Sequence, residues 1–184
     1  MRVLVRIILW LLVIVVIIGL VGFFLPKNVS VDRSIAINTD PAVVYNILND
    51  LKTYDEWMPW NKKDPQMKKE FGPKTVGEGA WYKWDSKDKN VGTGKLTIVE
   101  SVPSQKVITS LEFADYDPTE GGWDMKPNGN GTEVRWFMNS NMGNNPFSRW
   151  MGLMMNQMVG PDFEKGLQDL KRIAEGKTSS PSGT

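Results

Sequence analysis

The sequence SIAINTDPAVVYNILNDLKTYDEWMPW occupies residues 34–60 and contains an extended segment followed at once by two short helical patterns. The extended segment alternates apolar and polar residues, which is typical of a strand with one covered face. Asp40 and Pro41 then supply a capping side chain and a proline at the first helical position. Residues 51–57 predict a further turn or two of helix, which Pro59 is expected to stop. This stretch therefore predicts a domain that opens with a strand and two short helices.

Downstream of this opening, a period of two in the apolar residues predicts a run of strands. Only one face of each strand is apolar, which favours an antiparallel sheet covered on one side. The turn at residues 127–131, PNGNG, predicts a tight hairpin between the last two strands, because Asn-Gly tolerates positive φ. The apolar residues predicted to face the interior are Ala80, Tyr82, Trp84, Leu96, Ile98, Val107, Leu111, Phe113, Trp123, Met125, Val134, Trp136 and Met138.

The last element is predicted to be a long amphipathic helix that ends at Gly176. Gly160 and Pro161 are expected to kink it or divide it in two. Its apolar stripe is interpreted as one continuous face that packs on the sheet, which gives an α+β fold. The stripe consists of Phe147, Trp150, Met151, Met154, Met155 and Met158, followed by Phe163, Leu167, Leu170 and Ala174.

The order of these elements and four motifs within them resemble the SRPBCC (START-like) superfamily, in its polyketide cyclase/dehydrase-like branch. The motifs lie at residues 34–45 (SIAINTDPAVVY), 50–60 (DLKTYDEWMPW), 131–136 (GTEVRW) and 160–167 (GPDFEKGL). The resemblance implies a helix-grip fold, in which a curved antiparallel sheet wraps around a long C-terminal helix and encloses a cavity. It carries over no catalytic residue, because the active residues of catalytic members vary.

Members of this superfamily bind lipids, hydrophobic metabolites or polyketides, act as cyclases, or serve as interaction modules without a reaction. The leading hypothesis is a module that binds a hydrophobic small molecule or lipid and is non-catalytic. A polyketide cyclase/dehydratase-like enzyme and a protein-interaction module of stress or chaperone-related type remain as alternatives, and fold alone does not choose among them. No particular protein partner is indicated.

The predicted ligand-binding residues are the inward side chains of the sheet and the methionines of the last helix. Met adapts to irregular apolar ligands, and the Tyr82 hydroxyl could orient a ligand oxygen. The same side chains would equally form a plain hydrophobic core. The set is Tyr82, Trp84, Leu96, Ile98, Leu111, Phe113, Trp123, Met125, Trp136, Met138, Met151, Met154, Met155 and Met158.

Composition removes much of the usual catalytic chemistry. The 184-residue chain has no Cys and no His, so it offers no thiol nucleophile, no imidazole base and no histidine- or cysteine-bound metal. No catalytic constellation, metal site or cofactor is predicted, which tilts the interpretation away from an enzyme. A net charge of +1 gives no electrostatic reason to bind nucleic acid, and the lysine pairs at 62–63 and 68–69 are interpreted as a solvated loop.

Residues 7–25 form an uninterrupted uncharged run of apolar residues with two glycines and one tryptophan. As a helix this run is about 28 Å long, close to the hydrocarbon thickness of a bilayer. It exceeds the apolar region of a signal peptide and lacks a small-residue cleavage site, so an uncleaved single-pass anchor is predicted. Arg2 and Arg6 favour a cytoplasmic N-terminus and an extracytoplasmic domain. The predicted organisation is an anchor at 1–27, a domain at 28–176 and a disordered polar tail at 177–184.

Overall fold

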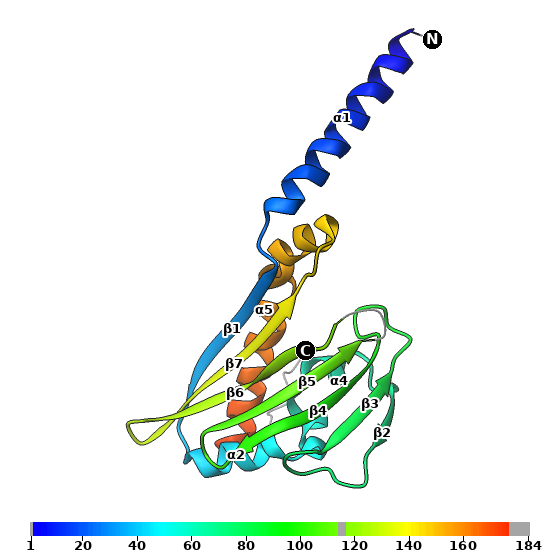
Figure 1. Ribbon diagram of the computed structural model, residues 1–184. Helices are drawn as coiled ribbons and strands as arrows, with labels where there is room; N and C mark the ends of the chain where they lie inside the picture. The colour runs from blue at the N-terminus through cyan, green and yellow to red at the C-terminus, as the bar shows by residue number, and fades with distance from the viewer. Residues whose placement is uncertain (1, 114–116, 177–184) are drawn as a thin grey trace, which may run out of the picture.

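The computed structural model describes residues 2–113 and 117–176, which form one long protruding helix and an α+β domain (Figure 1). The predicted tail, residues 177–184, lies outside the described residues. The helices are α1 (Arg2–Phe24), α2 (Pro41–Asn49), a short 3₁₀ turn (Leu51–Thr53), α3 (Tyr54–Trp57), α4 (Pro59–Lys63) and α5 (Pro146–Ala174). The strands are β1 (Asn28–Ile37), β2 (Lys68–Phe71), β3 (Trp81–Asp85), β4 (Thr93–Val102), β5 (Lys106–Phe113), β6 (Thr119–Asn128) and β7 (Gly131–Asn141).

The seven strands form one sheet in the order β1-β7-β6-β5-β4-β3-β2, and every neighbouring pair is antiparallel. The first strand of the chain thus pairs with the last, Val31 opposite Met138, so β1 lies beside β7. The predicted antiparallel sheet and helix-grip arrangement are confirmed. Edge strand β2 is an addition: residues 68–69, expected in a loop, pair with β3. Its sequence KKEF has charged residues at three of four positions, as edge strands often do.

The short helices and α5 cover one face of the sheet, and the core lies between the two layers. The predicted start of α2 is confirmed: the Asp40 carboxylate accepts a hydrogen bond from the Ala42 N–H at 2.7 Å, and Pro41 is the first helical residue. Pro59 is expected only to end a helix, but in the structure it also begins one. α3 ends at Trp57, and Pro59 opens α4, because proline fits the first turn of a helix.

Helix α1 leaves the domain at the end where α5 begins (Figure 1). It is long and apolar enough to cross a membrane by length and composition, criteria that a signal sequence also meets. Three residues separate α1 from β1, and the Lys27 carbonyl accepts a hydrogen bond from the Met142 N–H at 2.7 Å. The chain is therefore tied to the β7–α5 connection as soon as it leaves α1.

Helix α5 is one continuous element that Gly160 and Pro161 do not divide. The Asn145 side chain caps its start by accepting from the Phe147 N–H at 2.9 Å. The second half packs in the core through Phe163, Leu167 and Leu170, as predicted. The first half extends beyond these contacts to the base of α1, where the Gly22 backbone lies against Pro146.

Candidate functional site

Aromatic rings pack against one another between the sheet and the helices. Trp57 and Trp123 lie 5.6 Å apart between ring centroids in an edge contact, and Tyr54 meets both. Trp136 stacks on Phe163 of α5 at 4.2 Å. These rings belong to four elements that surround the interior: α3, β6, β7 and α5. The interior is therefore apolar and aromatic, as the sequence predicts.

The structure brings the ten predicted sheet residues together in this interior, which confirms their inward orientation and leaves ligand binding a prediction. Seven of them are buried: Tyr82, Trp84, Leu96, Ile98, Trp123, Met125 and Trp136. Leu111, Phe113 and Met138 are half-buried against the same cluster, as is Met155 from α5. These four half-buried side chains form what we call the rim: Leu111, Phe113, Met138 and Met155.

The other three predicted methionines do not face the interior, which corrects their expected orientation. Met151, Met154 and Met158 are 51%, 55% and 56% exposed. The cause is the phase of the helix. From Met158 to Phe163 the stripe advances five residues, which at 3.6 residues per turn rotates it by about 140°. The two halves of the stripe thus lie on nearly opposite sides of α5.

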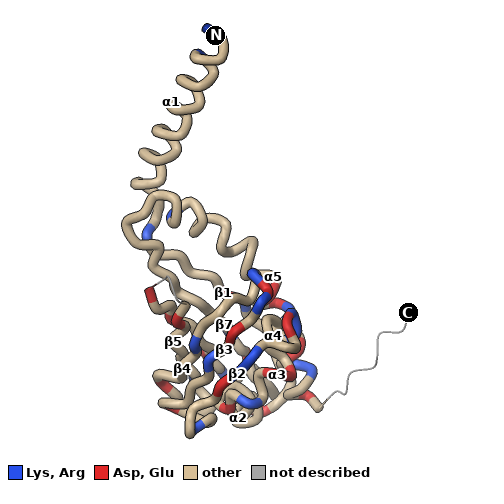
Figure 2. Tube along the Cα trace, turned by 90° about the vertical axis from the view of Figure 1, so that its right-hand side faces the viewer, with Lys and Arg blue, Asp and Glu red and all other residues tan. Residues whose placement is uncertain are grey.

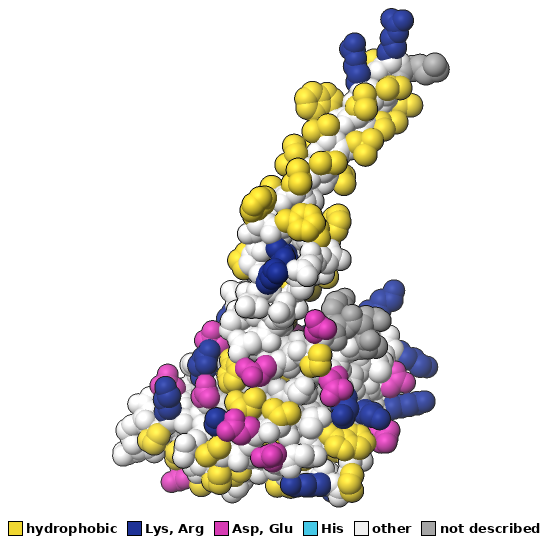
Figure 3. All heavy atoms as spheres, in the orientation of Figure 1, with side chains coloured by type: hydrophobic (Ala, Val, Ile, Leu, Met, Phe, Trp, Pro, Cys, Tyr) yellow, Lys and Arg dark blue, Asp and Glu magenta, His cyan; other side chains and the backbone are white. Residues whose placement is uncertain are grey.

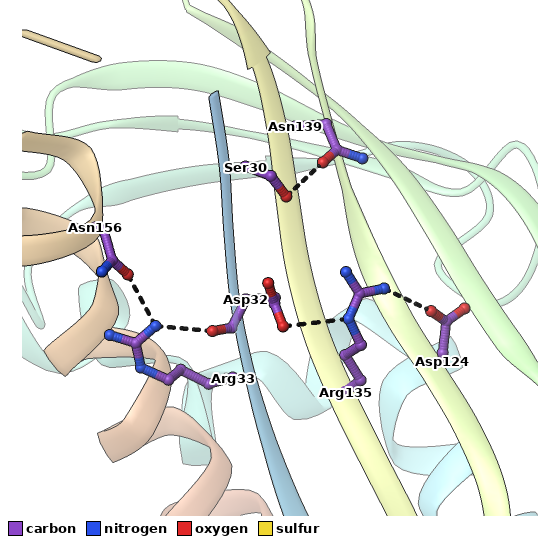
Figure 4. A network of polar contacts seen from close by, with 7 residues as sticks. All are labelled: Ser30, Asp32, Arg33, Asp124, Arg135, Asn139 and Asn156. Atoms are coloured by element: carbon purple, nitrogen blue, oxygen red, sulfur yellow. Dashed lines mark hydrogen bonds and ion pairs between the residues drawn. The ribbon is translucent and has the colours of Figure 1, made fainter. Parts of the chain in front are cut away.

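In the first half of α5, the face that packs on the domain carries small and polar residues. Gly152 lies against Val29, and Gly160 lies against the Arg33 guanidinium. Arg33 of β1 donates to Asn156 Oδ1 at 2.9 Å (Figure 4) and to Glu164 Oε1 at 2.6 Å. These contacts set the rotation of α5 about its own axis.

The Arg33 contacts belong to a polar network on β1, β6 and β7 (Figure 4). Arg135 donates to Asp32 at 3.3 Å and to Asp124 at 3.2 Å, which joins the three strands. Ser30 adds a hydrogen bond to Asn139 at 2.8 Å. We interpret this network as structural, because its carboxylates are half-exposed and paired with arginine.

The ionisable groups in the described interior are phenols. The Tyr54 hydroxyl donates to the Leu48 carbonyl at 2.8 Å. Burial, with a smaller contribution from nearby Tyr82 and Asp50, raises the pKa of Tyr54 well above its usual value. Burial, and then the Asp55 charge, raises the pKa of Tyr82 in the same direction. Both groups stay protonated near neutral pH, so they can donate hydrogen bonds but do not serve as bases.

Sequence reasoning missed two members of the site on the short helices, Tyr54 and Trp57. Both are completely buried. The signal that could have found them is the spacing of aromatic residues in DLKTYDEWMPW, which places them three residues apart on one helical face. The indole N–H groups of Trp57 and Trp123 are buried without a hydrogen-bond partner, as is the Thr97 hydroxyl on β4.

Two hollows on the surface of the domain lie away from this interior. One, of about 340 Å³, lies over the paired ends of β1 and β7 at residues 28–30 and 139–141. The other, of about 500 Å³, lies between the start of α2 and the β6–β7 hairpin. Neither is lined by a predicted ligand-binding residue. Among the described residues, no cluster of three or more Asp, Glu, His or Cys could hold a metal ion.

A family model described as "Polyketide cyclase / dehydrase and lipid transport" matches residues 28–175. The chain belongs to this family. The match covers nearly all of the predicted domain, and the resemblance to the polyketide cyclase-like branch of SRPBCC proteins is confirmed. Membership of the polyketide cyclase / dehydrase and lipid transport family supports a ligand-binding module.

Solved structures share the fold at low sequence identity. Protein SA2116 of Staphylococcus aureus, of unknown function, is 13% identical with a TM-score of 0.62, over 84% of this chain and 98% of that one. The di-domain ARO/CYC StfQ of the steffimycin biosynthetic pathway is 13% identical with a TM-score of 0.61, over 82% and 52%. The Aha1 dimer of Colwellia psychrerythraea is 16% identical with a TM-score of 0.57, over 82% and 99%. No curated protein matches the sequence significantly.

Proposed function

We propose that this chain is a membrane-tethered member of the polyketide cyclase / dehydrase and lipid transport family that binds a hydrophobic small molecule or lipid without transforming it. Residues 1–27 are the anchor and residues 28–176 the binding module. The observation that carries the binding proposal is the aromatic interior with two buried indole N–H groups that lack a partner. The proposed ligand site lies between the sheet and α5, in the interior that the rim separates from solvent.

The unpaired N–H groups indicate which ligand chemistry fits this interior. A buried donor without an acceptor costs about 1–3 kcal/mol, which a ligand oxygen would recover. Trp57 and Trp123 are neighbours, so one carbonyl, carboxyl or hydroxyl oxygen could approach both. The rings around them would contact an apolar body. An apolar molecule with a single oxygen-bearing group meets both requirements.

The rim is the proposed entrance for a ligand to the interior. Its four side chains are half-buried, and two of them are methionines, which change rotamer at little cost. Met155 belongs to α5 and the other three to β5 and β7, so side-chain movement at the rim would open the interior between sheet and helix. The proposed absence of catalysis rests on chemistry: the described interior presents phenols and indoles but no carboxylate.

The packing of α1 supports an anchor that is retained. Arg149 is only 5% exposed and donates to the Phe23 and Leu25 carbonyls at the end of α1. A guanidinium in this position complements the negative end of the helix dipole. Cleavage after α1 would remove these acceptors and expose the Arg149 side chain. Arg2 and Arg6 favour a cytoplasmic N-terminus, with the domain on the other side of the membrane.

Native mass spectrometry of the full chain in detergent micelles tests the binding proposal, with a dansyl-labelled fatty acid as the probe. We expect one bound apolar molecule from the cells or one bound probe. Met155→Trp fills the rim and should weaken probe binding by about tenfold or more, equivalent to about 1.4 kcal/mol. Met154→Trp, one residue away on the exposed side of α5, is the matched control and should bind as the unmodified chain does.

A chain that carries no molecule and takes up no probe would overturn the binding proposal. If Met155→Trp and Met154→Trp bind the probe equally well, the binding site does not lie behind the rim. The anchor is tested on the same preparation: the intact mass should include residues 1–27. Protease added to intact cells should digest the domain if it lies outside the cytoplasm, and a protected domain would reverse the proposed topology.

A further inference from the structure

The first half of α5 exposes an apolar face at the end of the domain where α1 leaves. We call this the α5 face and define it as Phe147, Met151, Leu153, Met154 and Met158, each more than half exposed. Four of its members recur at spacings of four, three and four residues, so they form one stripe along the helix. Neighbouring exposed apolar side chains of this kind are typical of an interaction surface.

The distribution of charge limits what can cover the α5 face. Between Arg135 and Asp162 the chain has one charged residue, Arg149, and that side chain is buried against carbonyls of α1. Charged residues resume with Asp162 and follow closely to the end of α5. Figure 2 shows this boundary: the first half of α5 is tan except for Arg149, and red and blue follow in the second half. Figure 3 shows charged side chains gathered on the body of the domain and apolar ones along α1.

The contacts with α1 place this half of α5 at membrane depth if α1 spans a bilayer. The Trp150 indole donates to the Ile18 carbonyl at 3.0 Å. Ile18 lies seven residues before Leu25, the end of the apolar run, so this contact is about 10 Å along the helix from that end. Trp150 therefore lies beside residues that the anchor would hold within lipid.

We infer that the first half of α5 lies in the outer boundary of the lipid bilayer, with the α5 face against acyl chains and the charged second half in water. The partner is the lipid surface itself. Arg33, Asn156 and Gly160 hold the opposite side of α5 on β1 and so keep the apolar side turned outward. This inference rests on the proposed anchor, because α1 is what brings α5 to the membrane.

Depth-dependent quenching in proteoliposomes tests the inference, because the chain has no cysteine and accepts single labelled ones without background. An NBD fluorophore on Met154→Cys or Met158→Cys in full chain reconstituted in phosphatidylcholine vesicles should emit blue-shifted light. Lipids with dibrominated tails should quench it severalfold. Gln168→Cys, exposed on the second half of the same helix, is the matched control and should keep a water-like spectrum. Val15→Cys, exposed in the middle of α1, reports on the anchor.

Quenching at Val15 combined with water-like spectra at Met154 and Met158 would overturn the placement of α5 while the anchor stands. Absence of quenching at Val15 would overturn the anchor, and the α5 placement with it. A blue shift at Met154 that bromolipid does not quench, and that grows with protein density in the vesicle, would identify a second copy of the chain as the partner and also overturn the inference.

Discussion

Of the tyrosines within residues 2–113 and 117–176, Tyr54 and Tyr82 are the two that the fold buries, and they lie 6.2 Å apart between ring centroids. The Tyr54 hydroxyl donates to a carbonyl of α2. Each tyrosine ring also contacts a tryptophan, Trp57 for Tyr54 and Trp84 for Tyr82. Because burial penalises the phenolate, each folded-state pKa is raised above the value of the unfolded chain. The stabilisation associated with these protons is therefore present below the unfolded pKa and is lost as pH rises above it.

This linkage predicts alkaline sensitivity that one substitution reduces. Above about pH 10 the unfolded chain loses protons that the folded chain keeps, so each buried phenol lowers the free energy of unfolding by up to about 1.4 kcal/mol per pH unit. Tyr82→Phe should make the decline of unfolding free energy between about pH 10 and 11.5 shallower than in the unmodified chain. Urea titrations of the full chain in detergent at several pH values measure this slope. Parallel declines in the two proteins would show that Tyr82 ionises freely in the folded state.

At the scale of elements, the strands and α2 could be predicted because their signals are local. A period of two and an Asp-Pro helix start need no knowledge of distant residues. Strand β2 could not be predicted in this way, since KKEF has no alternation and is specified by pairing with β3. The positions of Tyr54 and Trp57 in the site could not be predicted either, because they depend on the packing of α3 against β6.

The α5 methionines show why part of the candidate site could not be predicted from the stripe alone. Residues 147–158 and 163–174 each have helical periodicity, and they lie in one helix. Periodicity within each half does not say that the two faces coincide, and the rotation between them of about 140° turns the first half outward. The buried side of the first half was harder to recognise, because Gly152, Asn156 and Gly160 are not apolar.

Two buried glycines of α5 differ in what surrounds them, and the difference predicts outcomes of different size. A methyl group at Gly166 would lie 2.5 Å from Trp136 Cζ3 and 3.0 Å from Pro59 Cδ, both held in the core. A methyl group at Gly160 would overlap the guanidinium of Arg33, which is held by hydrogen bonds to Asn156 and Glu164. Replacing a helical glycine by alanine otherwise gains about 1 kcal/mol.

Gly166→Ala should therefore lower the free energy of unfolding by about 1–2 kcal/mol, because overpacking costs more than the helix gains. Gly160→Ala should lower it by less than Gly166→Ala does, because Arg33 is partly exposed and can move aside once its hydrogen bonds to Asn156 and Glu164 are given up. Urea unfolding of both variants measures the difference between them. An equal loss in both would indicate that Arg33 is as tightly held as Trp136.

At the scale of the whole molecule, the domain is joined to α1 at several points. The connection from Phe24 to Asn28 is short, Lys27 is hydrogen-bonded to Met142, and Arg149 and Trp150 both hold α1 carbonyls. A tether of this kind fixes the orientation of the domain, whereas a flexible linker would only limit its distance. The rim and the α5 face, which share one helix, would then keep a constant position relative to the membrane.

A fixed orientation predicts a narrow distance distribution between the two ends of the molecule. Spin labels on Val5→Cys in α1 and Asn130→Cys in the β6–β7 hairpin, both exposed, should give one narrow peak by double electron–electron resonance in lipid nanodiscs. Insertion of a Gly-Ser segment after Pro26 should broaden that peak, because the added backbone loosens the connection. Arg149→Leu removes the guanidinium contacts without lengthening the chain, so the broadening that it causes measures how much of the rigidity comes from α5 and how much from the short connection. A distribution already broad in the unmodified chain would mean that α1 and α5 do not stay in contact, and the membrane would then have to position the domain without them.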